Sequence, residues 1–451
     1  MTNTRLIVLD TLIQYEKEGT MLRPLLNAVL DKYGFLDPRD RAFIKMLTEG
    51  TVERLITLDH IIDKVSKVST VKMKPAIRMI VRMGAYQLCF MDHIPDNAAV
   101  NEAVKLTHAK HIDGLKGFVN GVLRGVIRYR DKGIEYPDLK TEYSCPDWIY
   151  ERFVKDHGRE KAEMMLKASV GDMPMYLRVN SRYHTEDQVI DALEKEGIKA
   201  EGAEILRVTE GSLVPGLSEA FNKGMYSIQD MSSQMAMEAL WGQVKDYINQ
   251  EKIVNINVID VCASPGGKTC FMAEHLKENG KIKAFDISEY KLDAIRQNIE
   301  RTRLDNVTVS IGDALSYNEE LAQTADVVIA DLPCSGLGVL GRKVDIKYRV
   351  NPQDIDELCK QQRTILKNAI RYLKNGGFLL FSVCTVTKEE TFDQSSFISG
   401  IGGEGAEGTQ AEADSVFAVL QKTDERMFLQ GCDPCDGFYY AIFKKVSENK
   451  S

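Results

Sequence analysis

The stretch ADVVIADLPCSGLG, residues 325–338, changes character halfway along its length. Its first six residues are apolar at all but one position and rich in valine and isoleucine, which is typical of a strand buried on both faces. The proline and glycines that follow predict a loop at the end of that strand. Cys334 lies in this loop, three residues after Asp331. A thiol there is either a small core residue or a chemical reagent.

Four more runs of the same kind follow Asp230 and are separated by stretches with helical periodicity. The expected strands are 257–262, 281–288, 306–314, 325–333 and 377–385, and the expected helices are 267–278, 288–303 and 354–373. Such alternation predicts an α/β fold, Rossmann-like, with a doubly wound, mostly parallel sheet over residues 229–447. Two further strands flank the turn DPCDG. The glycine-rich, acidic residues 397–412 are expected to form a flexible insertion.

The N-terminal part of the chain has a different pattern. Residues 1–130 show helical periodicity and almost no strand signal, so we expect an all-α domain. Pro75 fits the first position of one helix and Asp96 fits the N-cap of another. Residues 131–147 lose the periodicity and are expected to be a linker. Residues 148–228 mix a helix with short strands, which predicts a small α+β subdomain.

Charge is distributed unevenly along the chain. The net charge is −8, but residues 1–145 hold 22 basic against 18 acidic residues, a net of +4. Between Lys64 and Met91 the chain has six basic residues and no acid: Lys64, Lys67, Lys72, Lys74, Arg78 and Arg82. Such a stretch suits contacts with RNA phosphates, and it is equally compatible with a solvated helix face.

Several classes of protein do not fit the sequence. No apolar run reaches the roughly 18 residues of a membrane-spanning helix, and Asp10 interrupts the short apolar stretch near the N-terminus. Nine cysteines, an odd number, argue against a disulfide framework and for a reducing compartment. The pair in CDPC, residues 432–435, has no second pair, so we expect no metal site. We therefore expect a cytoplasmic protein that contacts no membrane and is a monomer.

Polar or reactive side chains follow every expected strand of the parallel sheet. The first strand leads into CASPGGKT, residues 262–269; Asp286 and Asp313 follow the next two; Asp331 and Cys334 follow the fourth; Cys384 follows the fifth. Because ligands of doubly wound sheets bind beyond the carboxyl ends of the strands, these side chains predict one site.

The first three strand ends have the pattern of an adenosine site. The glycines of SPGG allow a backbone to approach a ligand closely, and a carboxylate about 20 residues later accepts hydrogen bonds from ribose hydroxyls. Asp286 has that spacing, and Asp313 is placed to reach the adenine. This loop is not the G-x-G-x-x-G dinucleotide fingerprint, and the chain has no G-x-x-x-x-G-K-[ST] phosphate-binding loop. An adenosine ligand without a polyphosphate indicates S-adenosylmethionine.

The two cysteines indicate what is methylated. Carbon 5 of a pyrimidine becomes nucleophilic only after a thiolate adds to carbon 6, and an acid near N3 assists that addition. Cys334, Cys384 and Asp331 supply two thiols and a carboxyl group. Lys268 is a candidate for the cation that helps ionise a thiol.

At these residues the sequence resembles the Sun/RsmB-type RNA 5-cytosine methyltransferases. The matching motifs are DVCASPGGKT, DLPCSG and FSVCTVTKEE, with LRVNS and YSIQDMSSQ in support. Residues 1–130 resemble the NusB-type RNA-binding module of the bacterial small-subunit members. The resemblance implies a methyltransferase that uses S-adenosylmethionine and modifies cytosine 967 of 16S ribosomal RNA, free or in an early small-subunit assembly intermediate.

The resemblance also implies a role for each matching residue. Cys384 corresponds to the nucleophile, Cys334 to the cysteine that releases the product, and Asp331 to the acid beside N3. Lys268 corresponds to a residue near the target base. Asp286 and Asp313 correspond to ribose and adenine contacts, and Asp331 also lies near the methyl donor. The cofactor loop corresponds to Cys262, Ala263, Ser264, Pro265, Gly266, Gly267 and Lys268.

One departure from the family pattern leaves an alternative open. The family usually has Thr-Cys-Ser around the nucleophile, whereas this chain has Val383-Cys384-Thr385. DNA 5-cytosine methyltransferases attack with the cysteine of a Pro-Cys motif, which would be Cys334. Amino-group methyltransferases favour a Pro-aromatic pair where Cys334 and Ser335 stand, so they fit less well. Two other hypotheses are a methyltransferase acting on another RNA cytosine and a non-catalytic RNA-binding factor in transcription or ribosome assembly.

Overall fold

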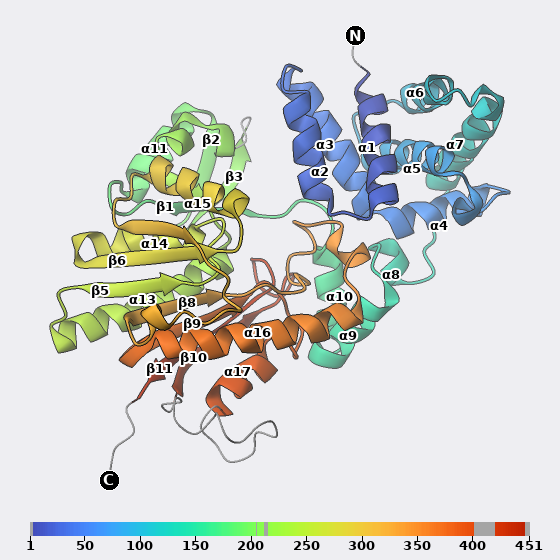
Figure 1. Ribbon diagram of the computed structural model, residues 1–451. Helices are drawn as coiled ribbons and strands as arrows, with labels where there is room; N and C mark the ends of the chain where they lie inside the picture. Colours follow the sequence, from blue (N-terminus) through green and yellow to red (C-terminus); the bar gives the residue numbers. More distant parts are fainter. Residues whose placement is uncertain (1–2, 204, 212–214, 401–419, 447–451) are drawn as a thin grey trace. The chain divides into compact units, whose positions relative to one another are not determined.

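The computed structural model describes residues 3–203, 205–211, 215–400 and 420–446 (Figure 1). The chain divides into two compact units. The first consists of residues 1–171 together with 340–350, and the second of residues 172–339 and 351–451. The domain boundaries that the sequence suggested, at 130, 147 and 228, stay a prediction. Each unit has its own hydrophobic core.

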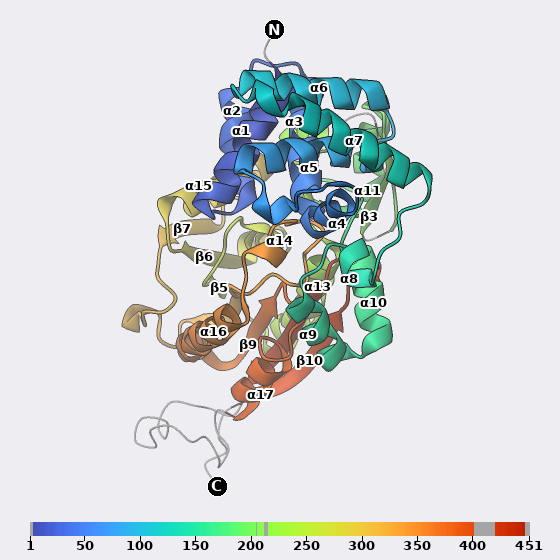
Figure 2. The ribbon, with the colours of Figure 1, turned by 90° about the vertical axis from the view of Figure 1, so that its right-hand side faces the viewer.

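The first unit is all-α, as predicted. Figure 2 shows its helices from a second side. They are α1 (Thr4–Glu18), α2 (Leu22–Lys32), α3 (Pro38–Glu53), α4 (Leu55–Val65), α5 (Pro75–Phe90), α6 (Asp96–Ala109), α7 (Lys116–Asp131), α8 (Leu139–Glu142), α9 (Asp147–His157) and α10 (Arg159–Ala168). Short 3-10 turns lie at Thr70–Lys72, Asp113–Leu115 and Ile346–Tyr348.

The starts of two helices test the sequence reasoning. Pro75 is the first residue of α5, as predicted, where its missing N–H costs nothing. The prediction that Asp96 caps α6 is wrong: the N-cap is Pro95, and Asp96 is the first helical residue. Its carboxylate instead binds Arg130 at 2.8 Å, and this hydrogen bond lowers the pKa of Asp96.

Residues 131–147 are not a free linker. They contain helix α8, and the Ser144 and Cys145 side chains are buried. Ser144 Oγ accepts a hydrogen bond from the Ile56 backbone N–H at 2.9 Å, and Thr57 Oγ1 donates to the Thr141 carbonyl at 2.7 Å. This stretch lacks apolar periodicity because polar side chains and backbone groups, rather than an apolar stripe, attach it to α4.

The basic stretch divides into two parts. Arg78 and Arg82 are only slightly exposed and form ion pairs with Glu16 and Asp59 at 2.7 and 2.6 Å. Their charges therefore stabilise the helical unit. The exposed remainder is Lys64, Lys67, Lys72 and Lys74, around the turn between α4 and α5.

Residues 340–350 belong to the helical unit although they lie between strands of the second unit. Asp345 Oδ2 accepts from the Leu22 backbone N–H at 2.6 Å, at the start of α2. The Tyr348 hydroxyl donates to the Glu53 carbonyl at 3.0 Å, and Arg349 donates to the Tyr15 carbonyl at 2.8 Å. These polar contacts attach the segment to three helices.

A small antiparallel sheet opens the second unit. Its order is β2 (Ile198–Glu201), β3 (Leu206–Gly211), β1 (Met175–Val179) and β4 (Tyr226–Ile228), and α11 (Glu186–Lys195) packs on it. Helix α12 (Glu219–Asn222) precedes β4. Arg178 of β1 forms a buried ion pair with Glu274 of the following domain, and Asn180 donates to the Thr302 carbonyl at 3.1 Å. The small sheet and that domain are thus one compact unit.

The larger sheet has seven strands, in the order β10-β11-β9-β8-β5-β6-β7. They are β5 (Ile256–Asp260), β6 (Gly280–Asp286), β7 (Val307–Ile311), β8 (Ala325–Asp331), β9 (Leu373–Val383), β10 (Leu420–Phe428) and β11 (Phe438–Lys445). The first five in this list pair in parallel, and β11 pairs antiparallel with both β9 and β10. The predicted doubly wound, mostly parallel sheet is confirmed.

Helices cover both faces of this sheet, so its strands alternate between two apolar cores. On one face α13 (Met231–Glu251), α14 (Gly267–Leu276) and α15 (Glu289–Thr302) pack against residues such as Val258 and Ile329. On the other, α16 (Pro352–Tyr372) and α17 (Phe392–Gly400) pack against residues such as Ile259 and Val328. Figure 1 shows α16 along the sheet.

The expected insertion is shorter than predicted. Residues 397–400 belong to α17, and Ile398 is fully buried in the core between α16 and β11. Its apolar side chain holds these residues in the helix despite the glycines that follow. Residues 401–412 lie outside the described residues. No helix among the described residues is long and apolar enough to cross a membrane.

Candidate active site

The order of the strands places the predicted site residues along one edge of the sheet. Reading β9, β8, β5, β6 and β7, the strand ends carry Cys384, then Asp331 with Cys334, then the loop after Asp260, then Asp286, then Asp313. The thiols are therefore neighbours, and the expected cofactor residues continue from them. The sequence order alone does not give this arrangement, because β8 pairs with β5 across two intervening strands.

The cofactor loop is a tight turn between β5 and α14. The Ala263 N–H donates to the Phe285 carbonyl at 2.9 Å, and the Gly266 N–H donates to the Ala263 carbonyl at 2.6 Å. Gly266 has a φ of 102°, and a Cβ there would lie 3.3 Å from Ile295 Cγ2. Glycine is therefore required at this position for conformation and for space.

A cavity of about 190 Å³ adjoins this loop. It is lined by Ile228, Gln229, Asp230, Ser233, Asp260, Cys262, Ala263, Ser264, Pro265, Gly267, Lys268 and Asp331. Asp260 Oδ1 and Gln229 Oε1 are buried and have no hydrogen-bond partner among the described residues. Two such acceptors fit the amino group of the methionine part of S-adenosylmethionine. The hydrogen-bond acceptors of the cavity therefore suit that cofactor.

Asp286 and Asp313 lie beyond that cavity, at the next two strand ends. Asp286 is buried; Oδ2 accepts from the Ser264 N–H at 3.0 Å, and Oδ1 binds Lys291 at 3.0 Å. Asp313 is exposed, and its Oδ1 accepts from the Leu315 N–H at 2.9 Å. Asp286 thus connects the cofactor loop to β6, whereas Asp313 stands at the surface beside β7.

Lys268 and Asp331 form the charged centre of the site. Lys268 Nζ lies 2.7 Å from Asp331 Oδ2, and the lysine side chain is only 8% exposed. Asp331 Oδ1 accepts a hydrogen bond from Ser382 Oγ at 2.7 Å. The ammonium group is also 5.1 Å from the centroid of the Phe438 ring. The carboxylate is therefore oriented from two sides, by α14 and by β9.

The sulfurs of Cys334 and Cys384 lie 3.2 Å apart. Both side chains are partly exposed. The hydrogen bond with Cys384 raises the pKa of Cys334 well above its usual value, and burial and the nearby charges of Cys384 and Glu390 act in the same direction. The two thiols therefore form one hydrogen-bonded pair, in which either sulfur can be the donor.

The unusual residues around Cys384 have different surroundings. Val383 is fully buried in the core between the sheet and α16. Thr385 Oγ1 lies 2.8 Å from Ser335 Oγ and 3.1 Å from Glu390 Oε2. The hydroxyl after Cys384 is therefore retained in a hydrogen-bonded position, and the valine before it is a core residue.

Three groups of site residues received no role from the sequence. Ser382 orients Asp331, and Glu390 binds the residues that follow both cysteines. Gln229, Asp230 and Ser233 line the cavity. All five lie within quoted motifs: Ser382 and Glu390 in FSVCTVTKEE, and Gln229, Asp230 and Ser233 in YSIQDMSSQ. The missing signal was spatial, since nothing local shows that β4 and α13 reach the cofactor loop.

Asp260 is a further buried carboxyl group of this site. It is 1% exposed, and its Oδ2 accepts from Thr269 Oγ1 at 2.6 Å. Burial raises its pKa to about 7, and the charge of Asp331 adds to this effect. Its position at the end of β5, just before the loop, was the available clue in the sequence.

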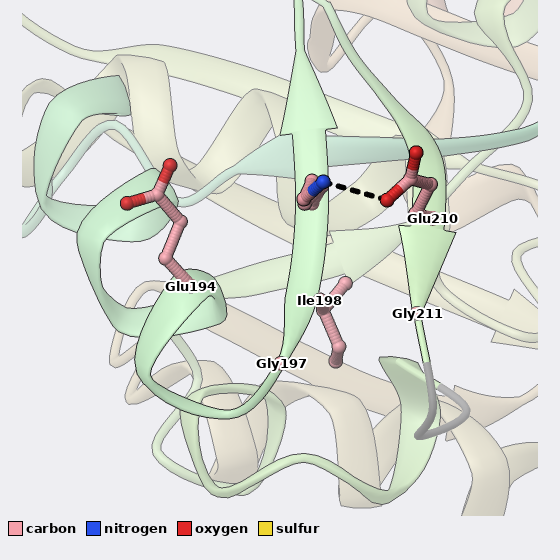
Figure 3. A pocket seen from close by; sticks show the side chains of 6 residues that line it. Glu194, Gly197, Ile198, Glu210 and Gly211 are labelled. Carbon is pink, nitrogen blue, oxygen red and sulfur yellow. Dashed lines mark hydrogen bonds and ion pairs between the residues drawn. The ribbon is translucent and has the colours of Figure 1, made fainter.

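A second cavity lies on the small sheet, away from the strand ends (Figure 3). It measures about 540 Å³ and is lined by Glu194, Gly197, Ile198, Lys199, Glu210 and Gly211. Lys199 and Glu210 form an exposed ion pair at 2.6 Å across its wall. None of its lining residues is a thiol or part of the cofactor loop, so it is not part of the candidate active site.

Family models match three parts of the chain. Residues 249–444 match the 16S rRNA methyltransferase RsmB/F model, residues 2–128 match the NusB family, and residues 145–209 match the RsmF/B-like ferredoxin-like domain. Among solved structures, the crystal structure of PH0851 has a TM-score of 0.74 at 21% identity and covers 99% of each chain. NSun6 from Pyrococcus horikoshii, solved with SFG, has a TM-score of 0.53 at 20% identity, covering 67% of this chain and 99% of that one. These two show the fold.

Curated relatives extend over most of the chain. The probable ribosomal RNA small subunit methyltransferase B of Bacillus subtilis (strain 168) is 31% identical over 400 residues, 86% of each protein. Ribosomal RNA small subunit methyltransferase B of Proteus mirabilis (strain HI4320) is 30% identical over 454 residues, 98% of this chain and 99% of that protein. The chain therefore belongs to the RsmB/Sun family of S-adenosylmethionine-dependent 16S rRNA methyltransferases, with a NusB-type domain at its N-terminus.

Proposed function

We propose that this protein methylates carbon 5 of a cytosine in 16S ribosomal RNA, with Cys384 as the covalent nucleophile. The observation that carries the proposal is the pair of sulfurs 3.2 Å apart. Cys334 lies three residues after Asp331, and Asp331 lines the cofactor cavity. Methylation of an amino group or a hydroxyl needs no thiol, whereas methylation of a pyrimidine carbon needs one.

We propose a particular side chain for each movement of protons and electrons. Cys384 attacks carbon 6 of an extruded cytosine while Asp331 donates a proton to N3, which leaves carbon 5 electron-rich. S-adenosylmethionine supplies the electrophilic methyl group. Cys334 then takes the proton from carbon 5, the bond between Cys384 and carbon 6 breaks, and N3 returns its proton to Asp331, which restores the ring. Lys268 Nζ, 2.7 Å from Asp331 Oδ2, holds Asp331 in position and balances the negative charge that Asp331 carries after it has given its proton to N3.

The pair of thiols also explains why Cys334 is suited to the second half of the reaction. Its sulfur lies 3.2 Å from that of Cys384, so it stands beside the base that Cys384 would hold and can take the proton from carbon 5. Cys384, rather than the cysteine of the Pro-Cys motif, is proposed as the attacking group because FSVCTVTKEE matches the family's nucleophile motif.

The helical unit supports a ribosomal RNA substrate. Lys64, Lys67, Lys72 and Lys74 are exposed around one turn, and no ion pair holds them among the described residues. They are suited to phosphate contacts. We propose cytosine 967 as the target, in free 16S rRNA or in an early small-subunit assembly intermediate. We also propose that the enzyme is monomeric and cytoplasmic.

The test uses labelled S-adenosylmethionine and 16S rRNA from cells that lack the enzyme. The wild type is expected to place one label per RNA in 5-methylcytosine at position 967. Cys384→Ala is expected to abolish labelling, and Cys334→Ala to accumulate a protein–RNA complex that survives denaturant. Cys432→Ala, which changes an exposed cysteine outside the site, is the matched control and is expected to retain activity.

Each result has a distinct consequence. A stable complex with Cys384→Ala rather than Cys334→Ala would exchange the two roles. Label on the exocyclic amino group would contradict the carbon 5 chemistry. Label at another cytosine would correct the target only, and RNA binding without any label would support a non-catalytic factor.

A further inference from the structure

Glu390 is a carboxylate in the interior of the catalytic unit with no lysine or arginine paired to it among the described residues. Its side chain is fully buried. It is neutralised by hydrogen bonds alone: Oε1 accepts from the Ser335 N–H at 2.8 Å, and Oε2 from Thr387 Oγ1 at 2.8 Å. Burying a charge without a countercharge is costly, so donors must satisfy it on every side.

These donors come from both cysteine loops. Ser335 follows Cys334, and its hydroxyl donates to Glu390 Oε2 at 2.5 Å. Thr385 follows Cys384, and its Oγ1 lies 3.1 Å from the same oxygen. One carboxylate is therefore hydrogen-bonded to the residue directly after each cysteine.

The backbone provides a second connection between the same loops. The Leu332 N–H donates to the Ser382 carbonyl at 2.9 Å, and the Gly338 N–H donates to the Cys384 carbonyl at 3.2 Å. These bonds fix the ends of the Cys334 loop. Between them the loop is held by three further contacts. Ser335 bonds Glu390 and Thr385, the Pro333 carbonyl accepts from Gln362 Nε2 at 2.9 Å, and the two sulfurs meet.

We propose that Glu390 is a positioning residue of the active site, which holds the Cys334 loop and the Cys384 loop at the separation that brings the two sulfurs together. It does not touch the reacting atoms; it acts through Ser335 and Thr385. The inference rests on the proposed function only for its effect on turnover, because the distance between the sulfurs is a property of the protein without RNA.

The chemistry of the contacts explains why a carboxylate is needed. An ionised carboxylate only accepts hydrogen bonds, and here every partner is an N–H or O–H group. In Glu390→Gln one oxygen becomes an NH₂ group. Facing the Ser335 N–H, this group places donor against donor; facing the hydroxyls of Ser335, Thr385 and Thr387, it requires one of them to turn and accept. The change therefore weakens the contacts to the cysteine loops without altering the volume of the core.

The first experiment compares Glu390→Gln with Glu425→Gln. Glu425 also accepts from three side chains, Ser395, Lys422 and Tyr439, but none of them lies on a cysteine loop. Glu390→Gln is expected to lower kcat about 100-fold, the effect of misplacing reacting groups by about 1 Å, with KM for cofactor and RNA changed less than about twofold. Glu425→Gln is expected to keep kcat within about twofold of the wild type at a temperature where it is folded.

The second experiment measures the separation of the sulfurs without RNA. A reagent that alkylates two adjacent thiols is added to the full-length protein, and mass spectrometry quantifies the peptide bridge between Cys334 and Cys384. The bridge is expected in the wild type and in Glu425→Gln, and at about tenfold lower yield in Glu390→Gln, because its yield follows the effective concentration of one thiol near the other.

The two readouts separate the possible failures. If the wild type methylates no RNA but the bridge depends on Glu390, the proposed function fails and the positioning role stands. Equal bridging in Glu390→Gln and the wild type would overturn the positioning role. So would a fall in melting temperature with unchanged kcat, which would make Glu390 a residue of the core only.

Discussion

Cys334 and Cys384 are 50 residues apart in the chain, and their sulfurs lie 3.2 Å apart beyond the ends of the neighbouring strands β8 and β9. A parallel pair of strands places both carboxyl ends at one edge, so the two loops meet there. Asp331 opposes Ser382 in the same pair of strands, which brings the carboxylate to the same place. The reacting groups are therefore positioned by strand register.

Gly338 and Gly437 allow this close approach of the loops, and replacing Gly338 should disrupt it. A Cβ on Gly338 would lie 2.1 Å from the Gly437 carbonyl oxygen and 3.0 Å from the Cys384 oxygen. Because these are backbone atoms, Gly338→Ala must move the Cys334 loop, and we expect about 100-fold lower methyl transfer. The control is Gly242→Ala in α13, where nothing lies within 4 Å. It should keep full activity and gain about 0.5–1 kcal/mol of stability. Equal activity of the two variants would contradict the prediction.

Lys268 and Lys291 both bind an aspartate of the site but should affect different kinetic parameters. Lys268 is nearly buried against Asp331, so Lys268→Met should lower kcat by about 100-fold. Lys291 is half exposed, 3.0 Å from Asp286, and Lys291→Met should raise the KM for S-adenosylmethionine less than about fivefold and leave kcat unchanged. Initial rates at saturating and limiting cofactor measure both. If Lys291→Met changed kcat and Lys268→Met did not, the roles of the two lysines would have to be exchanged.

The residues on either side of Cys384 should differ in their tolerance to substitution. Thr385→Val removes the hydroxyl near Ser335 and Glu390, and we expect about tenfold lower kcat, whereas Thr385→Ser should retain activity. Val383→Thr restores the common family residue but buries a hydroxyl in an apolar core. It should cost about 1–3 kcal/mol of stability and leave kcat unchanged. Steady-state kinetics and urea unfolding measure the two effects. A higher kcat in Val383→Thr would show that the family threonine acts in catalysis.

The buried carboxyl group of Asp260 should make stability depend on pH. Burial raises its pKa from the ordinary 3.8 to about 7 in the folded protein. Between pH 3.8 and pH 7 the folded state therefore binds more protons than the unfolded state. The stabilisation that this protonation gives is complete below pH 3.8 and is lost as the pH rises through 7. Relative to the wild type, Asp260→Asn should gain about 2–4 kcal/mol on going from pH 5 to pH 8. The change is measured by urea unfolding without cofactor. If the difference in free energy of unfolding between Asp260→Asn and the wild type did not vary with pH, the prediction would be wrong.

Lys347 should have the opposite pH dependence in the helical unit. It is 1% exposed, its Nζ has no hydrogen-bond partner among the described residues, and burial lowers its pKa from 10.5 to about 8. The folded state binds fewer protons between these values, so stability falls as the pH drops from 10.5 through 8. Lys347→Met should therefore raise stability at pH 7 by about 2 kcal/mol.

The control for this change is Lys445→Met. Lys445 is also buried, but its Nζ donates to the Leu373 carbonyl at 2.8 Å. Its loss leaves a carbonyl without a donor, so the variant should lose about 1 kcal/mol. Thermal unfolding of both variants at pH 7 and pH 10 measures the contrast. A loss of stability in Lys347→Met would show that its ammonium group has a stabilising partner.

Local patterns in the chain were sufficient for the elements and for the residue types of the site. Continuous apolar runs predicted β5, β8 and β9, since a strand covered on both faces must be apolar at successive positions. Alternation of apolar and polar residues predicted β6 and β7, which lie towards the edge of the sheet. Polar residues at each strand end predicted Asp331, Cys334 and Cys384 as one group. Polar contacts gave no such pattern. The prediction that residues 131–147 are a linker was therefore wrong, and the prediction of the site residues was incomplete because it left out Glu390.

Hydrophobic periodicity and glycine-rich turns are local properties, so the strands, the helices and the reactive groups at the strand ends could be predicted from the residues along the chain. The tertiary structure set the order β9-β8-β5-β6-β7, which puts the two thiols beside each other and the cofactor loop beside them. It also decided that Glu390 connects both cysteine loops and that Thr385 replaces a family serine in that network. These relationships depend on which strands pair and in what register, and that choice is made by the packing of the whole sheet.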